Sequence, residues 1–436
     1  MTPSSDPRSA KSATRIREEL ARRSTTARAV LEQALDVVVA REPTVRAWKL
    51  MRDAPARQRA DALDGDLDRR DGGLLAGIPV AVKDLMDTAD MPTAYGSTIY
   101  AGHQPARDAA CVARLRAAGA NILGKTITTE FAYFSPGETT NPWDAARTPG
   151  GSSSGSAAAV AAGMVPLALG SQTAGSLIRP ASYCGVFALK PTHGVFDLQG
   201  VKGLSPSLDT LGWLARTAND LELMRCALLD EPFAPLPDMP ASGCRVGVLR
   251  THEWAEAQPD GQAAFEEAVR RLQASGMTLI GKDMPGEQAT LAQDQKRVMA
   301  YEAARELAFE LEHHADALSR PLRELLNQGR ALTQAEYLAA QARAAVGRQV
   351  AQALMADVDA LLVPAAPGEA PLGLDATGDP VFSRVWTLLG LPCVSVPGLR
   401  GPHGMPIGMQ LVGHRHQERA LLALAASVHI VLDTPL

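Results

Sequence analysis

Two short runs of small residues and one lysine hold the side chains that could do chemistry in this sequence. Residues 150–156 read GGSSSGS and residues 173–176 read TAGS, so both runs place hydroxyl groups on glycine-rich backbone. Lys83 lies in the apolar run IPVAVKDL, where it either reaches solvent from a strand edge or is buried. Burial would lower the pKa of its amine, which could then act as a base. The glycine-rich backbone could also point N–H groups at an anion.

Other familiar sites have little support in the sequence. No G-x-S-x-G elbow follows a plausible apolar strand, and the 150–156 run lacks the lysine of a phosphate-binding loop. His414 and His416 form an H-x-H pair beside a predicted strand, and could be metal ligands or part of a solvated loop. The five cysteines are far apart and form no C-x-x-C pair, so we expect reduced thiols and no metal site.

Composition and charge narrow the class of protein. The chain has 436 residues, 46% of them hydrophobic, which is enough for a sizeable core. The formal net charge of −5 and the lack of a long basic run indicate neither a nucleic-acid partner nor an anionic membrane. The N-terminus lacks the apolar region of a signal peptide, and no run of eighteen apolar residues could span a membrane. We therefore expect a cytoplasmic protein.

Helix and strand patterns alternate around the candidate residues. The run 75–84 predicts a buried strand, and residues 108–126 and 156–173 each predict a helix that ends at a glycine and is followed by a strand. A late pair of strands is expected at 390–399 and 404–413. This alternation predicts an α/β fold with a largely buried sheet.

The remaining segments have no chemical motif. Residues 1–11 predict a polar, disordered tail, and helices are expected from 14 to about 41 and over 53–73. Residues 251–355 are rich in Ala, Glu, Arg and Gln at helical spacing, and we expect helices that cover the sheet. Because no convincing linker divides the chain, residues 12–436 are expected to form a single domain.

Three ordered blocks resemble the amidase signature family of hydrolases. The block at 77–97 contains Lys83, the block at 150–192 contains both runs of small residues, and the block at 390–413 is the late strand pair. The resemblance covers most of 24–225 and 360–425. It implies the amidase-signature fold, in which helices cover both faces of a large mixed β-sheet.

The resemblance also implies a Ser–cis-Ser–Lys triad. Ser152, the first serine after the paired glycines, matches the cis-serine, Ser176 matches the nucleophile 24 positions later, and Lys83 matches the base. We expect a cis peptide bond between Gly151 and Ser152, and no metal or organic cofactor. Backbone N–H groups of the second run would stabilise the oxyanion, and the expected donors are Thr173, Ala174, Gly175 and Ser176.

The chain departs from the commonest family pattern at three positions. Ala174-Gly175 stands where paired glycines are frequent, and Arg179 follows Ser176 by three residues instead of two. Gln172 stands where many members have aspartate, which removes a possible charge near the nucleophile. These differences leave open the oxyanion geometry and the usual supporting role of the arginine.

The expected activity is hydrolysis of a C–N bond next to a carbonyl group. Small amides, anilides, carbamates and some esters fit the resemblance, and Tyr133, Phe134 and Trp213 could line the substrate pocket or simply pack in the core. We expect a small-molecule amide or carbamate substrate, no nucleic-acid or membrane partner, and a monomer or homodimer. The alternative is the A subunit of a glutamyl-tRNA amidotransferase, which shares the triad and passes ammonia to a partner subunit.

Overall fold

One large mixed β-sheet organises the chain. The computed structural model describes residues 10–65 and 72–434, so most of the expected tail and residues 66–71 of the expected 53–73 helix lie outside it, and residues 72 and 73 are not helical. The described residues form an 11-stranded sheet with the order β1-β3-β2-β4-β6-β5-β10-β11-β9-β7-β8. Its strands are β1 Trp48–Met51, β2 Pro79–Lys83, β3 Asn121–Thr126, β4 Leu167–Gln172, β5 Phe187–Lys190, β6 Thr210–Ala215, β7 Arg245–Leu249, β8 Thr278–Lys282, β9 Ala360–Pro364, β10 Cys393–Arg400 and β11 Pro406–Gly413.

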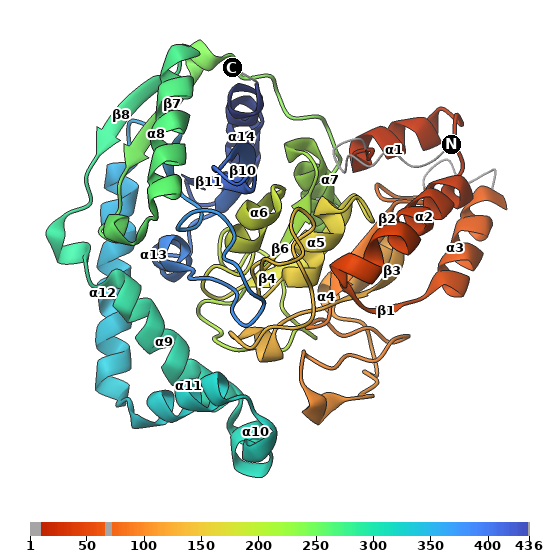
Figure 1. The fold of residues 1–436 in the computed structure, drawn as a ribbon, viewed down its shortest axis with the longest axis horizontal. Coiled ribbons are helices and arrows are strands. Elements are labelled where there is room, and N and C mark those ends of the chain that lie inside the picture. The colour runs from red at the N-terminus through yellow and green to blue at the C-terminus, as the bar shows by residue number, and fades with distance from the viewer. Residues whose placement is uncertain (1–9, 66–71, 435–436) are drawn as a thin grey trace.

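Helices cover both faces of this sheet, which confirms the expected α/β fold (Figure 1). The helices are α1 Ala13–Ala21, α2 Ala27–Val45, α3 Asp53–Gly65, α4 Ala110–Ala117, α5 Ser154–Ala161, α6 Ile178–Cys184, α7 Ala218–Leu229, α8 Pro259–Ala274, α9 Leu291–Glu306, α10 Ala308–His313, α11 Arg320–Ala331, α12 Gln334–Leu354, α13 Val381–Leu388 and α14 Glu418–Asp433. Within the described ranges, no helix combines the length and apolar character needed to cross a membrane.

Alternation along β2 sends side chains into different layers. Val80 and Val82 pack in the core that includes α4, α7, α8 and α14, whereas Ala81 packs with α2 and α5 on the opposite face. This is the period of two that an extended strand imposes. Strand β2 is hydrogen-bonded in parallel to both β3 and β4, so it is an interior strand and all of its residues are buried.

The 251–355 region differs from its expected all-helical structure. Strand β8 lies within it and pairs in parallel with β7 at the sheet edge. Its residues are half-buried or exposed, so the sequence lacks the apolar run that marks an interior strand. Helices α9 to α12 gather at the left of Figure 1, and α9 packs against α11, α12 and α13 rather than lying flat on the sheet.

Candidate active site

Lys83 ends strand β2 and is fully buried, so it does not reach solvent from a strand edge. Its Nζ contacts two hydroxyl groups, Ser152 Oγ at 2.8 Å and Ser171 Oγ at 2.9 Å. Burial lowers the pKa of the Lys83 amine to about 7, and the negative charge of Asp209 partly opposes this shift. A substantial fraction of the amine is therefore neutral at neutral pH, as a general base requires.

The loop before α5 brings Ser152 to this lysine. The Gly151–Ser152 peptide bond is cis, as expected. Close packing explains why the residues here are small: a Cβ on Gly155 would lie 2.3 Å from the carbonyl oxygen of Ala47. The Ser153 backbone N–H donates to the carbonyl oxygen of Ser176, so the two runs of small residues are bonded to each other.

Ser176 lies in the turn between β4 and α6. Gln172 orients this turn, because its Oε1 accepts hydrogen bonds from the backbone N–H groups of Leu177 and Ile178. The side-chain amide of Gln172 thus orients the turn at the position where many members of the amidase signature family have an aspartate. Ser176 and Ser152 line the same cavity. A hydrogen bond between their hydroxyl groups, the second half of the expected relay, stays a prediction.

Three carbonyl groups of the turn accept hydrogen bonds, which fixes the orientation of the peptide groups that contain the expected oxyanion donors Ala174 to Ser176. Gln295 Nε2 donates to the Thr173 carbonyl oxygen, Thr387 Oγ1 to that of Ala174, and the Arg179 backbone N–H to that of Gly175. In a trans peptide the next N–H points away from the carbonyl oxygen. The N–H groups of the three following residues, Ala174 to Ser176, are therefore free of these partners.

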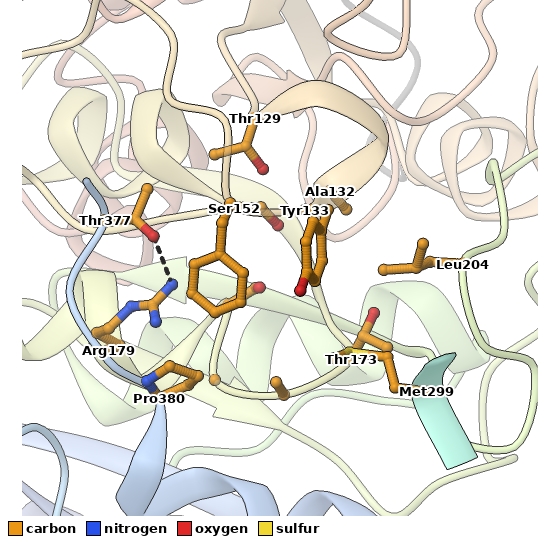
Figure 2. Close-up of a pocket in the computed structure, with 14 residues that line it drawn as sticks. Thr129, Ala132, Tyr133, Ser152, Thr173, Arg179, Leu204, Met299, Thr377 and Pro380 are labelled. Carbon is orange, nitrogen blue, oxygen red and sulfur yellow. Dashed lines mark hydrogen bonds between the residues drawn. The ribbon is translucent and has the colours of Figure 1, made fainter. Parts of the chain in front are cut away.

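The cavity that Ser152 and Ser176 line is small, and Figure 2 shows the side chains around Ser152. Its walls come from segments far apart in the chain. The residues that line it are Thr129, Ala132, Tyr133, Phe134, Ser152, Thr173, Ala174, Gly175, Ser176, Arg179, Leu204, Met299, Thr377 and Pro380.

The three aromatic residues expected near the substrate separate in the structure. Tyr133 and Phe134 line the cavity and meet edge to face, with ring centroids 4.9 Å apart. Trp213 lies elsewhere, because its side chain is fully buried on β6 and its Nε1 donates to the carbonyl oxygen of Leu221. The structure therefore places Trp213 in the core between β6 and α7 instead of in the cavity wall.

Several residues of the site were missed in the sequence. Ser171, the second partner of Lys83, lies only five residues before Ser176, so its place in the small-residue turn was the available signal. Met299 on α9 and the loop containing Thr377 and Pro380 reach the cavity from segments without any chemical motif. The pair His414 and His416 lies in a loop, and the described residues contain no His, Cys, Asp and Glu grouping suited to a metal ion.

Asp209 connects the base with the turn that carries the nucleophile. Its carboxylate accepts hydrogen bonds from Thr173 Oγ1 at 2.5 Å and from the backbone N–H groups of Leu204 and Ser205. Burial raises the pKa of Asp209 to about 6, against the effect of these donors. The carboxylate is still mostly ionised at pH 7, where it favours the charged form of Lys83.

Removing the negative charge of Asp209 should shift the pH dependence of kcat/KM. In Asp209→Asn the pKa of Lys83 should fall further, so the rising limb of kcat/KM should shift to lower pH. Steady-state rates between pH 5 and 9 measure the shift. Asp220→Asn is the matched control, since Asp220 is also a buried aspartate but bonds to Thr14. An unshifted limb in Asp209→Asn, or an equal shift in the control, would contradict this electrostatic role.

Comparison with known proteins gives the chain a clear set of relatives. The family model described as Amidase matches residues 29–422. The chain is 34% identical to the A subunit of a glutamyl-tRNA(Gln) amidotransferase from Roseiflexus castenholzii, over 96% of this chain and 95% of that one. A solved structure described as an amidase superposes with a TM-score of 0.89 at 31% identity, covering 97% of this chain and all of the other.

A second solved structure is described as a vestigial protein complex that reveals the evolutionary origins of an s-triazine catabolic enzyme. It is 32% identical, covers 96% of this chain and 98% of its own, and superposes with a TM-score of 0.85. These comparisons confirm the resemblance and the fold that it implied.

The expected partners need correction. We expected no nucleic acid and a monomer or homodimer, but several curated relatives are named as the A subunits of glutamyl-tRNA(Gln) amidotransferases. That name makes each of them one subunit of an enzyme named for a transfer RNA. The net charge of −5 did not reveal this, because a subunit can serve such an enzyme without offering a basic surface of its own.

Proposed function

The chain belongs to the amidase family, and on that premise we propose that it cleaves the C–N bond of a small carboxamide through an acyl-enzyme at Ser176. The observation that carries the proposal is the buried Lys83 amine, which contacts Ser152 at 2.8 Å beside the cavity that Ser176 lines. A base with a lowered pKa, a hydroxyl relay and a hydroxyl nucleophile then occupy one small site. We assign these roles to residues 12–436 acting as a single catalytic domain.

In the proposed reaction Lys83 starts as the neutral amine. The direction of the hydrogen bond between Lys83 and Ser152 then reverses, so that the serine hydroxyl donates to the lone pair on Nζ. Ser176 passes its proton to Ser152 as its Oγ attacks the carbonyl carbon, and Lys83 receives the Ser152 proton. The N–H groups of the turn stabilise the oxyanion, a contribution of about 3 kcal/mol for a single donor. The proton returns through Ser152 to the leaving nitrogen, and water releases the acid.

The relatives favour a more specific version of this function. Their identity extends over nearly the full chain and supports the A subunit of an amidotransferase over a stand-alone amidase for anilides, carbamates or esters. In that version the same cleavage releases ammonia, and a partner subunit consumes it. The solved relative found in a protein complex also favours a chain that works with partners.

Ammonia release with and without partners tests this version. The tagged chain would be purified from its native host together with bound proteins, which mass spectrometry identifies. We expect ammonia release from glutamine by the complex to exceed that of the lone chain by at least ~10-fold. Efficient hydrolysis of anilides, aryl carbamates or esters by the lone chain, unchanged when the bound proteins are restored, would instead support a stand-alone amidase.

A further inference from the structure

The cavity wall contains a buried arginine that makes no ion pair with any residue that the structure describes. Arg179 is only 2% exposed, and its guanidinium donates to the carbonyl oxygens of Gly378 and Gly151 and to Thr377 Oγ1 (Figure 2). All three acceptors are neutral. Among the described residues, Nε of Arg179 has no hydrogen-bond partner. Burial lowers the pKa of Arg179 to about 10, which still leaves the side chain charged at neutral pH.

A second buried arginine lies behind the first. Arg384 on α13 is 5% exposed and donates from Nη1 to Gln295 Oε1 at 2.8 Å. Its ion-pair partner Asp379 is 3.9 Å away, and the Asp379 side chain is 62% exposed. The positive charge of Arg384 also acts on Arg179, whose pKa it lowers. The fields of the two guanidinium groups therefore add near Arg179.

Two arginines elsewhere in the chain are neutralised more closely. Arg343 binds Asp294 through two short hydrogen bonds, and Arg225 does the same with Glu222. By contrast, none of the cavity-lining residues that the structure describes is acidic. A buried charge without a counter-charge is unfavourable, and a carboxylate that accepts the free N–H donors would offset that cost.

We propose that the cavity recognises an amide whose acyl group carries a carboxylate, held by Arg179 with the support of Arg384. The substrate class is then the monoamide of a small dicarboxylic acid, and the inference rests on the amide cleavage proposed above. The small size of the cavity agrees with this class, because its acyl groups have only a few carbons. Arg179 follows Ser176 by three residues, and both line the cavity, so the carboxylate and the amide lie close together.

Glutamine shares this chemistry, but it adds an α-ammonium group. Because the described lining offers no acidic side chain for that group, we expect the lone chain, without partner subunits, to cleave a simple monoamide faster than glutamine. Glutaramate differs from glutamine only in lacking the amino group, so comparing the two rates isolates the effect of that group. Faster cleavage of glutamine than of glutaramate would contradict this ranking.

Rates for charged and neutral amides test the carboxylate site. Glutaramate and hexanamide have similar length and differ in the terminal carboxylate. We expect kcat/KM for glutaramate to exceed that for hexanamide by at least ~100-fold. Arg179→Met should reduce this ratio by at least ~50-fold and Arg384→Met by ~5-fold. Arg320→Met is the matched control, since Arg320 is an exposed arginine on α11, and its ratio should not change.

A binding measurement keeps the test decisive if Arg179→Met loses activity with both amides. Glutarate should protect wild-type Ser176 from a fluorophosphonate reagent at a concentration at least ~20-fold lower than the uncharged pentane-1,5-diol, which has the same length. Hexanamide cleaved as fast as glutaramate, with equal protection by glutarate and the diol, would overturn the carboxylate site alone. No cleavage of any amide together with no labelling of Ser176 would instead overturn the proposed function.

Discussion

Ser176→Ala is expected to lose nearly all turnover while the protein stays folded. The hydroxyl is the proposed nucleophile, and removal of such a group costs on the order of 10⁴- to 10⁶-fold in kcat. The loss should appear in kcat, because the cavity keeps the side chains that bind the substrate. Ammonia release measures the rate, and circular dichroism with a melting curve verifies the fold. A wild-type protein treated with a fluorophosphonate should carry the label on Ser176.

The neighbouring serines provide the comparison for this prediction. Ser152→Ala should be less damaging, since a water molecule could partly replace the relay hydroxyl. Ser154→Ala is the matched control from the same loop, because the Ser154 hydroxyl donates to the carbonyl oxygen of Ile127 at 3.3 Å and takes no part in the proposed relay. A label found on Ser152 or Ser154, or a fully active Ser176→Ala protein, would show that another group is the nucleophile.

Lys83→Met should remove both the rate and its dependence on neutral pH. The charged amine cannot accept a proton, so the wild-type kcat/KM should fall about tenfold per pH unit below the Lys83 pKa of about 7 and level off above it. Loss of the base should cost roughly 10²- to 10⁴-fold. The remaining activity should show no rising limb between pH 6 and 8, because the variant has no amine of lowered pKa to accept the Ser152 proton.

A second buried lysine controls for the loss of a charge from the sheet. Lys190 on β5 is fully buried, and its Nζ donates to the carbonyl oxygen of Pro191. Lys190→Met should therefore keep the rising limb near pH 7, provided that its melting curve shows a folded protein. An acidic optimum in the wild type, or an unchanged pH profile in Lys83→Met, would assign the base to a different group.

The sequence by itself determined the family and the fold class. The two runs of small residues and the strand lysine are local patterns of a few residues each, so they can be recognised without knowing how the chain folds. Alternating helix and strand patterns likewise predicted the α/β sheet, because the period of apolar residues is a local property. Strand β8 was missed because an edge strand, exposed on part of its surface, lacks that apolar run.

Only the tertiary structure decided what surrounds these residues. Lys83 could have reached solvent or been buried, and pairing of β2 with both β3 and β4 determines that it is buried. Trp213 was placed in the core by the register of β6, and Met299 was brought into the cavity by packing of α9. Arg179 likewise meets neutral acceptors because distant loops converge on it. Such contacts join residues far apart in the chain, and no local pattern encodes the packing that brings them together.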